Sequence, residues 1–593
     1  MIHQKVRQRS AMHSRSAGRS PRFIVVCGLL LTALSFALFI LLESTTLWAN
    51  PGLIQDRLGG ISRPLTALFP ERWLNATFGS KLGLLNGVLY VLIVAAMFGV
   101  YLFALRRALK PGHFRDEDAR RTFCTIFLFT VAMLLIFLFV RGMMSPDIFS
   151  YIWYGRLWAV DGVSPFTHTA QEFAATDTTH WLQWVYWKQL YSPYGPVWVM
   201  FAGLIAKIAQ VGDGDIVNHL IGHRLLASLS HLLNIWLVWR TSDLLIGRYW
   251  HSILPARVRM PHAVPRSART RYVMTSREWQ PGARIWLVAA YAWNPLLLIE
   301  FGAGAHNDSL MLSFVLAGIW LHLAGKWKFA ACALACAVLV KFVAVCFLPG
   351  YIWLLWHENN AGSKGSRVGL MRAAQASGIA LATWVLFYLP FWEGPATLQG
   401  MAGGPTADWF AHSIPQFIVR FVPDALGQLI KFFNPGIDST QTVETLRSSL
   451  RAPVRLIFLA FALVVAAALT WRARSVPATI KSWGLLFFVL LTVGVSWFLP
   501  WYVSWLIVPA ALAGPGRLWN ATQMLAAGSL SVYVLDAGVG AWTGVLPYWV
   551  GSAFIAPPLI YLLVSFYRDR RHLLSALPSA QLVVAQVNNV EPA

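Results

Sequence analysis

The residue types best suited to chemistry lie between Met144 and Arg156, in the sequence Met-Ser-Pro-Asp-Ile-Phe-Ser-Tyr-Ile-Trp-Tyr-Gly-Arg. This segment follows an apolar run and combines one acid, Asp147, one base, Arg156, and several aromatic rings. Asp147, Tyr151 and Tyr154 are spaced so that an α-helix would present all three on one face. An acid among rings beside a membrane-length apolar run suggests chemistry on a molecule that is half lipid and half polar.

From these residues alone, two interpretations of Asp147 are open. Ser145 is placed to cap the predicted helix, and Pro146 suits its first position. In the simpler interpretation, Asp147 only complements the positive end of the helix dipole, and the rings belong to the aromatic belt at the membrane interface. In the other interpretation, Asp147 is a catalytic group. Its position relative to the membrane and to other polar residues distinguishes the two.

The composition indicates a membrane protein. Of the 593 residues, 57% are hydrophobic and only 12% are charged, which excludes an ordinary soluble protein of this length. The formal charge of +23 is of the sign that nucleic acids attract, but in membrane proteins basic residues gather in cytoplasmic loops. The five cysteines all lie in apolar runs without metal-ligand spacing, so we expect no structural disulfides.

The apolar runs predict an all-α polytopic protein with about fourteen transmembrane helices and both ends in the cytoplasm. The first run, residues 23–42, is expected to remain as an uncleaved membrane anchor. The expected organisation is a basic tail at 1–22, two transmembrane helices and a cytoplasmic loop at 23–121, a catalytic transmembrane unit at 122–391 with an external loop at 142–217, an external segment at 392–452, C-terminal transmembrane helices at 453–567 and a cytoplasmic tail at 568–593.

The topology depends on where the basic residues lie. The most basic loop covers residues 240–284 and belongs in the cytoplasm by the positive-inside rule. That placement requires the apolar segment 195–211 to lie in the membrane interface instead of crossing. The net charge is then explained by topology, and nucleic acid is excluded as a partner.

With this topology, several polar residues fall near the outer face, where such groups are costly unless they are paired or functional. Outside the Asp147 segment, this set is Lys188, Tyr194, Glu300, His306, Asn307, Asp308, Lys341, His412 and Arg451. Lys341 interrupts an apolar run, so its charge requires either an internal acid or a ligand phosphate. The His306-Asn-Asp308 turn and the rigid turn Tyr191–Pro196 are either ordinary connections or walls of a site.

The order of these parts resembles the GT-C class of membrane glycosyltransferases, and in particular the bacterial mannosyltransferases that use polyprenol-phosphate-mannose. The resemblance covers roughly residues 120–510 and rests on Asp147 to Arg156, Tyr194-Gly-Pro196, Glu300 with His306-Asn-Asp308, and Trp497-Phe-Leu-Pro-Trp-Tyr502. Ser164-Pro-Phe166 departs from the pattern, because an Asn is expected before the proline.

The resemblance implies transfer of a hexose from a polyprenyl-phosphate sugar to a hydroxyl of a glycan or lipid acceptor, at the outer face and with inversion. Asp147 is the expected base, and Asp308, with His306 and Asn307, is expected to orient hydroxyls, with Glu300 supporting their turn. Cations for the leaving phosphate are expected among Arg156, Lys341, Lys188 and Arg451, with Tyr151, Tyr154, Tyr194 and His412 around the substrates. No cofactor is expected, although Asp147 and Asp308 have the chemistry to hold a divalent ion.

Two other classes remain as alternatives. A transporter or lipid flippase of envelope precursors also has broken spans and buried charges, but it often shows an inverted internal repeat, which we do not find in this sequence. A non-catalytic envelope-assembly protein would use the aromatic loops as a scaffold. Product formation from a synthetic polyprenyl-phosphate sugar separates an enzyme from both.

Overall fold

A computed structural model describes residues 22–44, 81–110, 114, 116–140, 145–212, 214–253, 281–358, 363–402, 409–535 and 550–576. The expected basic tail, the loop at 254–280 and the end of the C-terminal tail lie outside the described residues. Within the described parts the chain is helical, and the only β-pairing there is one isolated bridge between Ala411 and Trp497. The predicted all-α class is therefore confirmed.

The predicted polytopic character is also confirmed. Eight helices in the described parts are long and apolar enough to cross a membrane: Arg22–Leu42, Leu85–Ala108, Asp118–Leu138, Pro281–Ala303, Arg367–Phe391, Thr440–Arg472, Val476–Gly494 and Val550–Arg568. Five shorter apolar helices accompany them, at Pro196–Val211, Asp308–Leu323, Trp327–Val340, Phe342–His357 and Pro500–Leu512. The count of about fourteen crossings stays a prediction.

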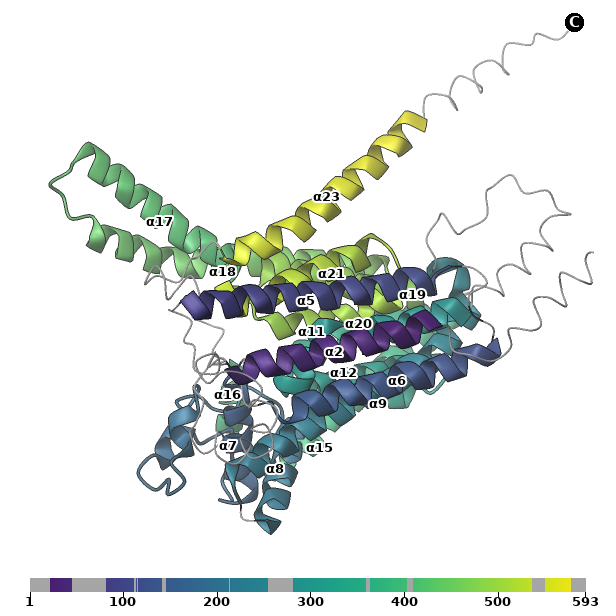
Figure 1. Cartoon of the computed structure of the whole chain (residues 1–593), viewed down its shortest axis with the longest axis horizontal. Coiled ribbons are helices and arrows are strands. Elements are labelled where there is room, and N and C mark those ends of the chain that lie inside the picture. Colours follow the sequence, from purple (N-terminus) through teal and green to yellow (C-terminus); the bar gives the residue numbers. More distant parts are fainter. Residues whose placement is uncertain are drawn as a thin grey trace, which may run out of the picture.

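Most of the long helices run side by side in one bundle, whereas α23 (Val550–Ala576) extends away from it (Figure 1). The N-terminal part consists of α2 (Arg22–Ser44), α5 (Lys81–Ala108) and α6 (Asp116–Leu138), and α2 packs against both of the others. Next to α6 lies α9 (Ile216–Ile253), which is long enough to cross but carries several buried polar side chains, including His223 and Asn234.

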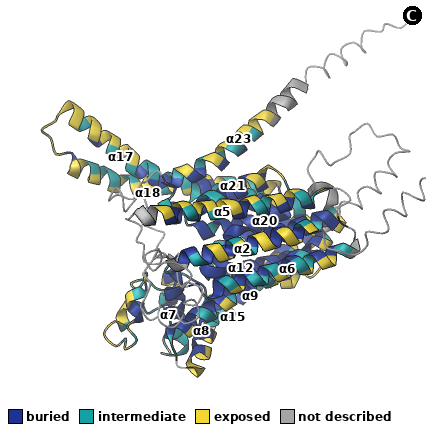
Figure 2. Ribbon diagram, in the orientation of Figure 1, coloured by how far each residue is buried: buried dark blue, intermediate teal, exposed yellow. Residues whose placement is uncertain are grey.

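The centre of the bundle is formed by short, buried helices (Figure 2). These include α11 (Pro295–Leu297), the π-helix η3 (Leu298–Ala303), α12 (Asp308–Leu323), α13 (Trp327–Val340) and α20 (Ser504–Leu512). The helix α12 packs against α9 on one side and α13 on the other. Because these central helices end inside the protein, their ends bring polar backbone and side chains into the interior.

At one end of the bundle lie α7 (Asp147–Ala159) and α8 (Pro196–Val211), which pack against each other (Figure 1). The predicted helix is thus present, but Pro146 immediately precedes it and does not occupy its first turn. Pro146 holds the N-cap position and no side chain caps the helix, so the prediction that Ser145 is the cap is wrong, although the backbone N–H of Asp147 donates to Ser145 Oγ at 3.3 Å.

The remaining helices complete the bundle and extend from it. They are α14 (Phe347–His357), α15 (Ser363–Tyr388), α16 (Gln399–Ala402), α17 (Ile414–Phe433), α18 (Thr440–Arg472), α19 (Val476–Val489), α21 (Arg517–Leu530) and α23 (Val550–Ala576). The helices α17 and α18 pack together as a hairpin that projects from the bundle (Figure 1). Many apolar side chains of this hairpin are exposed, among them Phe432 and Ile457, as expected for surfaces that meet lipid.

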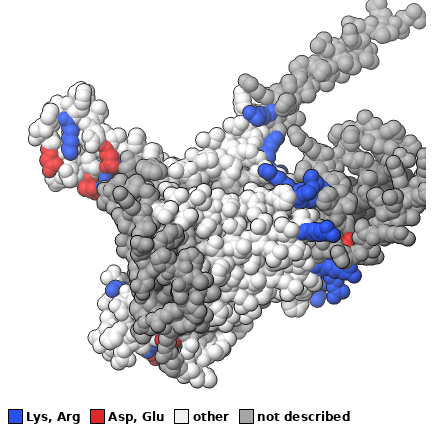
Figure 3. Space-filling view, viewed as in Figure 1, with Lys and Arg blue, Asp and Glu red and all other residues white. Residues whose placement is uncertain are grey.

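Charge divides the molecule along the bundle axis. On the face shown in Figure 3, the middle of the bundle is almost free of charged residues, while Lys and Arg gather at the end opposite α7. Arg106 and Arg107 in the last turn of α5 belong to this basic set. An uncharged middle with a basic end is the pattern expected of a bundle embedded in a bilayer.

Candidate active site

A cavity of about 660 Å³ opens at the α7 end of the bundle. Asp147 and Lys341 both contribute to its wall, although 194 positions separate them in the chain. Other parts of the wall come from the loop after η2 (Trp181–Trp184), the Pro193-Tyr194 turn, α18 and the segment 494–505. The cavity therefore joins segments that the sequence predicts to lie at the outer face.

Asp147 is the first residue of α7, so it lies at the positive end of that helix. Its side chain is mostly buried, and the Trp187 indole N–H donates to Asp147 Oδ1 at 3.4 Å. Removal from water raises the pKa of Asp147 to about 6, even though Lys341 and the Trp187 hydrogen bond favour the ionised form. A carboxylate with this pKa is ionised at neutral pH and is a better base than an exposed one.

Lys341, which also lines the cavity, forms an ion pair with Asp308. The helix α13 ends at Val340, and Lys341 has an extended backbone before the 3-10 helix η4 (Phe342–Cys346). Its Nζ donates to both carboxylate oxygens of Asp308, at 2.9 and 2.8 Å. The Trp505 indole N–H donates to the same carboxylate. Lys341 Nζ also lies 5.5 Å from the ring centroids of Tyr502 and Trp505.

Asp308 is fully buried and does not line the cavity. It lies behind Lys341 and Trp505, and donors from these two residues occupy both of its oxygens. The geometry therefore does not favour the expected role of Asp308 in orienting a sugar hydroxyl. Instead, Asp308 positions Lys341 and Trp505, which do line the cavity. The internal acid foreseen as one partner of Lys341 is Asp308.

Glu300 lies beneath the turn that leads to Asp308. The Tyr533 hydroxyl donates to both Glu300 carboxylate oxygens, at 2.9 and 3.1 Å. His306 Nε2 lies 3.3 Å from Glu300 Oε2. The backbone N–H of His306 donates to the backbone carbonyl of Glu300 at 3.2 Å. Burial and the nearby Lys341 hold the pKa of His306 well below its usual range, so the ring is neutral.

The His306 ring connects this buried cluster to the cavity. It stacks on the Trp501 ring with 3.9 Å between centroids and 18° between planes, and Trp501 lines the cavity. Asn307 is also buried, and neither polar atom of its side chain has a hydrogen-bond partner among the described residues. A buried amide without a protein partner is suited to a ligand or an ordered water.

The turn at Tyr194 requires its glycine. A Cβ added to Gly195 would lie 2.2 to 2.7 Å from the backbone of Leu339, the penultimate residue of α13. The Gly195 N–H donates to the Val340 carbonyl at 3.4 Å. This close approach fixes the chain immediately before Lys341 against the start of α8. The Tyr194 ring beside it packs edge-on against Tyr151, with 5.1 Å between centroids.

Other predicted residues lie away from the cavity. Arg156 is near the far end of α7, 3.8 Å from Asp161 and above the Trp181 ring. Lys188 lines a separate surface hollow, and His412 Nδ1 contacts the Phe498 carbonyl at 3.2 Å. Arg451 is exposed and does not line the cavity. Tyr154 donates to the Leu190 carbonyl at 3.2 Å and helps to shape the loop.

The geometry also identifies residues that sequence reasoning missed. Arg455 lines the cavity one helical turn after Arg451. The sequence prediction placed Arg451 in the external segment 392–452, whereas both arginines lie on α18. Trp187 and Trp505 donate to the two aspartates, but nothing local in the sequence distinguishes them from interfacial tryptophans.

Arg224, also missed, is fully buried on α9. It donates to the carbonyls of Leu138 and Val140 at the end of α6 and of Ala303 at the end of η3. A lone arginine within a predicted span was the available signal.

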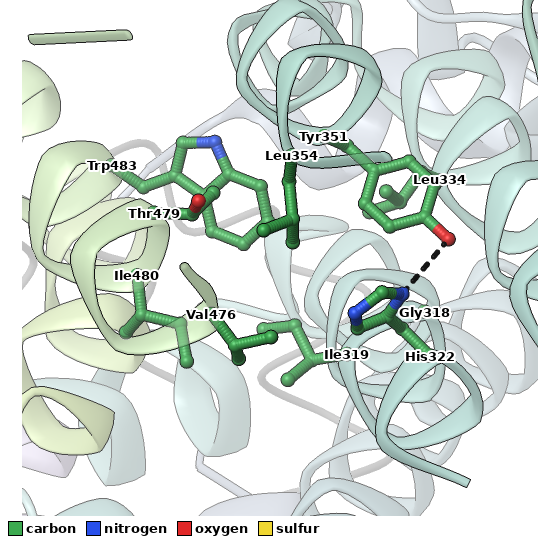
Figure 4. Close-up of a pocket in the computed structure, with 10 residues that line it drawn as sticks. All are labelled: Gly318, Ile319, His322, Leu334, Tyr351, Leu354, Val476, Thr479, Ile480 and Trp483. Atoms are coloured by element: carbon green, nitrogen blue, oxygen red, sulfur yellow. Dashed lines mark hydrogen bonds between the residues drawn. The ribbon is translucent and has the colours of Figure 1, made fainter. Parts of the chain in front are cut away.

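A second pocket lies near the other end of α12. It holds about 10 Å³, room for about one water molecule. On one side of this pocket the Tyr351 hydroxyl lies 3.4 Å from Nδ1 of the His322 ring, as the dashed line in Figure 4 shows. His322 follows Asp308 by 14 residues on one helix, which places it about 20 Å away. This pocket is too small and too distant to take part in the Asp147 site.

Among the residues that the structure describes, no cluster of three or more His, Cys, Asp or Glu side chains is placed to bind a metal ion. The positive charge of Lys341 already compensates Asp308. All five cysteines are free thiols.

Comparisons with known proteins show which enzymes this chain resembles. A profile of the MptA_B family, described as "Alpha-(1->6)-mannopyranosyltransferase, N-terminal domain", matches residues 59–248 and 259–357. The matched part contains Asp147, Asp308 and Lys341.

Individual relatives carry the same description. The chain is 27% identical over 525 residues to Alpha-(1->6)-mannopyranosyltransferase A of Mycobacterium tuberculosis, a match that covers 87% of each chain. It is 24% identical over 283 residues to the A enzyme of Corynebacterium glutamicum, which covers 47% of this chain and 49% of that one. The B enzyme of the same organism is 24% identical over 265 residues.

A helical membrane bundle with an acid and a lysine in one terminal cavity, together with these relatives, defines an integral-membrane glycosyltransferase of the GT-C class. Within that class, the matches support a mannosyltransferase that is similar to those of the MptA_B family.

Proposed function

We propose that this enzyme transfers mannose from a polyprenyl-phosphate mannose to a hydroxyl of a growing glycan at the outer face of the membrane. The observation that carries the proposal is the single cavity that joins Asp147 to Lys341 and opens onto apolar helices. Mannose as the sugar, and an α-(1→6) bond as the product, are supported by the names of the relatives.

The reaction requires one proton acceptor and compensation for one leaving anion. The acceptor oxygen attacks C1 of mannose, the bond from C1 to the phosphate oxygen breaks, and the hydroxyl proton passes to Asp147. The polyprenyl phosphate departs with the bonding electrons, next to Lys341 and Arg455. A displacement of this kind inverts C1, so an α product requires a donor whose sugar is β-linked.

The apolar flank of the cavity supports a lipid donor. Leu456 and Leu459 of α18, together with Leu490 of the π-helix η8 (Leu490–Gly494), form part of its wall. Leu456 and Leu459 are also exposed on the outside of the bundle. A chain held between α18 and η8 would reach the bilayer on one side while its phosphate meets Lys341 and Arg455 on the other. A soluble sugar nucleotide has no lipid chain that would bind to these apolar residues.

The charge distribution supports a site at the outer face. Basic residues gather at the end of the bundle opposite α7, and such ends face the cytoplasm in most membrane proteins (Figure 3). The cavity then faces outward, with both termini inside. The amino acids around it supply a base and cations without a metal, so we also propose that transfer needs no divalent ion.

The test is Asp147→Asn in the purified full-length enzyme, assayed with synthetic polyprenyl-phosphate mannose and an oligomannoside acceptor. We expect the initial rate to fall by more than about a hundredfold, because loss of a general base typically costs that much. Donor binding should persist, since the phosphate and lipid contacts are unchanged.

Asp161→Asn is the matched control, because Asp161 lies in the same external segment but pairs with Arg156 outside the cavity. It should retain the wild-type rate. Near-normal turnover of Asp147→Asn would remove Asp147 from the role of base.

A further inference from the structure

Four aromatic rings gather where the cavity meets the protein surface. Trp187, Trp409 and Trp497 lie with their centroids 5.3 to 5.7 Å apart, and Tyr186 lies 4.6 Å from Trp187. We call these four rings the aromatic platform. Trp187 and Trp497 line the cavity, whereas Trp409 and Tyr186 are about half exposed. The platform thus continues the cavity wall outward.

The platform is assembled from three distant segments and is held rigidly. The Ala411 N–H donates to the Ser496 carbonyl at 3.1 Å, and the Phe498 N–H donates to the Ala411 carbonyl at 2.9 Å. The Ser413 hydroxyl donates to the same Ser496 carbonyl at 2.6 Å. These bonds fix the loop of Trp409 to the loop of Trp497. Rings held in place lose little entropy when a ligand binds.

The orientation of Trp187 connects the platform to the chemistry. Its indole N–H points to Asp147, so its ring is oriented by the base and not by lipid headgroups. Arg455 and Leu459, the residues suited to the phosphate and the lipid, belong to α18 on another part of the wall. The aromatic part of the cavity is therefore free for the second substrate.

From this arrangement we infer that the aromatic platform is a binding subsite for hexopyranose units of the acceptor glycan that lie beyond the unit being extended. Aromatic faces carry partial negative charge and attract the C–H faces of a pyranose ring, which adjacent oxygens polarise. A sugar held between two parallel rings needs about 8 Å, twice the usual carbon–carbon contact distance. The spacing here is smaller, so the sugars stack on the outer faces of the platform.

The inference rests on the proposed function and specifies its acceptor as an oligosaccharide and not a single hexose. A membrane-belt role for the same rings is the competing explanation. It predicts effects on stability in the bilayer but none on acceptor affinity.

The test compares Trp409→Ala with the wild-type enzyme on oligomannosides of two and five units, with polyprenyl-phosphate mannose as donor. In the wild type, KM should be lower for the longer acceptor. In Trp409→Ala, KM for the longer acceptor should rise about tenfold, a magnitude typical of truncating an aromatic contact. KM for the disaccharide, which has only one unit beyond the one being extended, should rise less, and KM for the donor should not change.

Trp392→Ala is the matched control, because Trp392 is 53% exposed and does not line the cavity. It should behave as the wild type. Quenching of tryptophan fluorescence by the pentasaccharide, measured without donor, provides a readout that does not depend on transfer. It should weaken in Trp409→Ala and persist in Trp392→Ala.

Equal KM values for short and long acceptors in the wild type, or an unchanged KM ratio in Trp409→Ala, would overturn the subsite. Loss of stability in both variants without a change in KM would assign the rings to the membrane belt. Absence of mannose transfer in the wild type with every acceptor would instead overturn the proposed function.

Discussion

Asp147 combines a raised pKa with a place beside a cation. Burial opposes its ionisation, while Lys341 and the Trp187 indole favour it, and burial is the larger effect. The group therefore titrates near neutral pH, where a general base works best. The simpler interpretation of Asp147 as a helix-end charge does not account for its place in a cavity wall that also contains Lys341.

This pKa predicts how transfer depends on pH. A base acts in its ionised form, so kcat/KM should be level above about pH 7 and fall below pH 6, to about a tenth at pH 5. The profile should be measured over pH 4.5 to 8.5. In Trp187→Phe, loss of the hydrogen bond to the carboxylate should move the midpoint upward. A profile that stays flat down to pH 5 would contradict the assignment.

The raised pKa of Asp147 also predicts how the stability of the folded protein depends on pH. The Asp147 carboxyl ionises at a higher pH in the folded protein than in the unfolded chain, so folded-state stability falls as pH rises from about 4 to 6. Asp147→Asn removes that cost. Its thermal midpoint should exceed that of the wild type at pH 7 and match it near pH 4.

The pair of Lys341 and Asp308 predicts a distinctive pattern of rescue. Lys341→Met leaves a buried carboxylate without its cation, a loss of about 3 to 5 kcal/mol in comparable pairs. The thermal midpoint should fall, and transfer should be lost. The double variant Asp308→Asn/Lys341→Met should recover stability but not activity, because the leaving phosphate still lacks its cation.

Lys188→Met provides the comparison for this pair, because Lys188 lies outside the cavity. It should leave both stability and rate unchanged. If Lys341→Met were as stable as the wild type, the pair would not support the fold.

At the scale of elements, the site depends on helices that stop inside the protein. The end of α13 frees Lys341, the start of α12 presents Asp308, and the start of α7 presents Asp147. Both aspartates thus lie at helix N-termini, where positive backbone ends stabilise their charge. The close contact of Gly195 with Leu339 keeps the end of α13 in register with the start of α8.

Gly195→Ala tests that register. The added methyl group would collide with the Leu339 backbone, so either α8 or the end of α13 must move. Because Lys341 follows immediately, we expect transfer to fall at least about tenfold, as small displacements at active sites commonly do. Gly378→Ala is the control, because no atom outside its own helix lies within 4 Å of the added carbon. It should leave the rate unchanged, and an unaffected Gly195→Ala would show that the close contact is not needed.

Sequence reasoning located the elements better than their contacts. Apolar periodicity and the turn residues predicted α7, α8 and α12 within a few residues, because those signals are local. The Tyr533 hydroxyl on Glu300 joins residues 233 positions apart, and no local pattern predicts such a bond. Arg156 was misplaced for a related reason. Its position on α7 was correct, but nine residues of helix carry it about 13 Å from Asp147.

For the whole molecule, charge and apolarity define one axis. The basic end, the uncharged middle and the α7 end follow each other along the bundle, as Figures 1 and 3 show. The cavity lies at the α7 end, so the sidedness of the reaction follows from the orientation of the bundle. An outward cavity would receive donor and acceptor from the outer leaflet and the space beyond it.

Labelling with a membrane-impermeant maleimide in intact cells tests this orientation. Gln183→Cys places an exposed thiol in η2 near α7, and Arg474→Cys places one between α18 and α19 at the opposite end. After subtraction of the wild-type signal from the native cysteines, Gln183→Cys should react in intact cells. Arg474→Cys should react only after permeabilisation, because the positive-inside rule assigns its loop to the cytoplasm. The reverse pattern would place the cavity inside and require a donor presented by the inner leaflet.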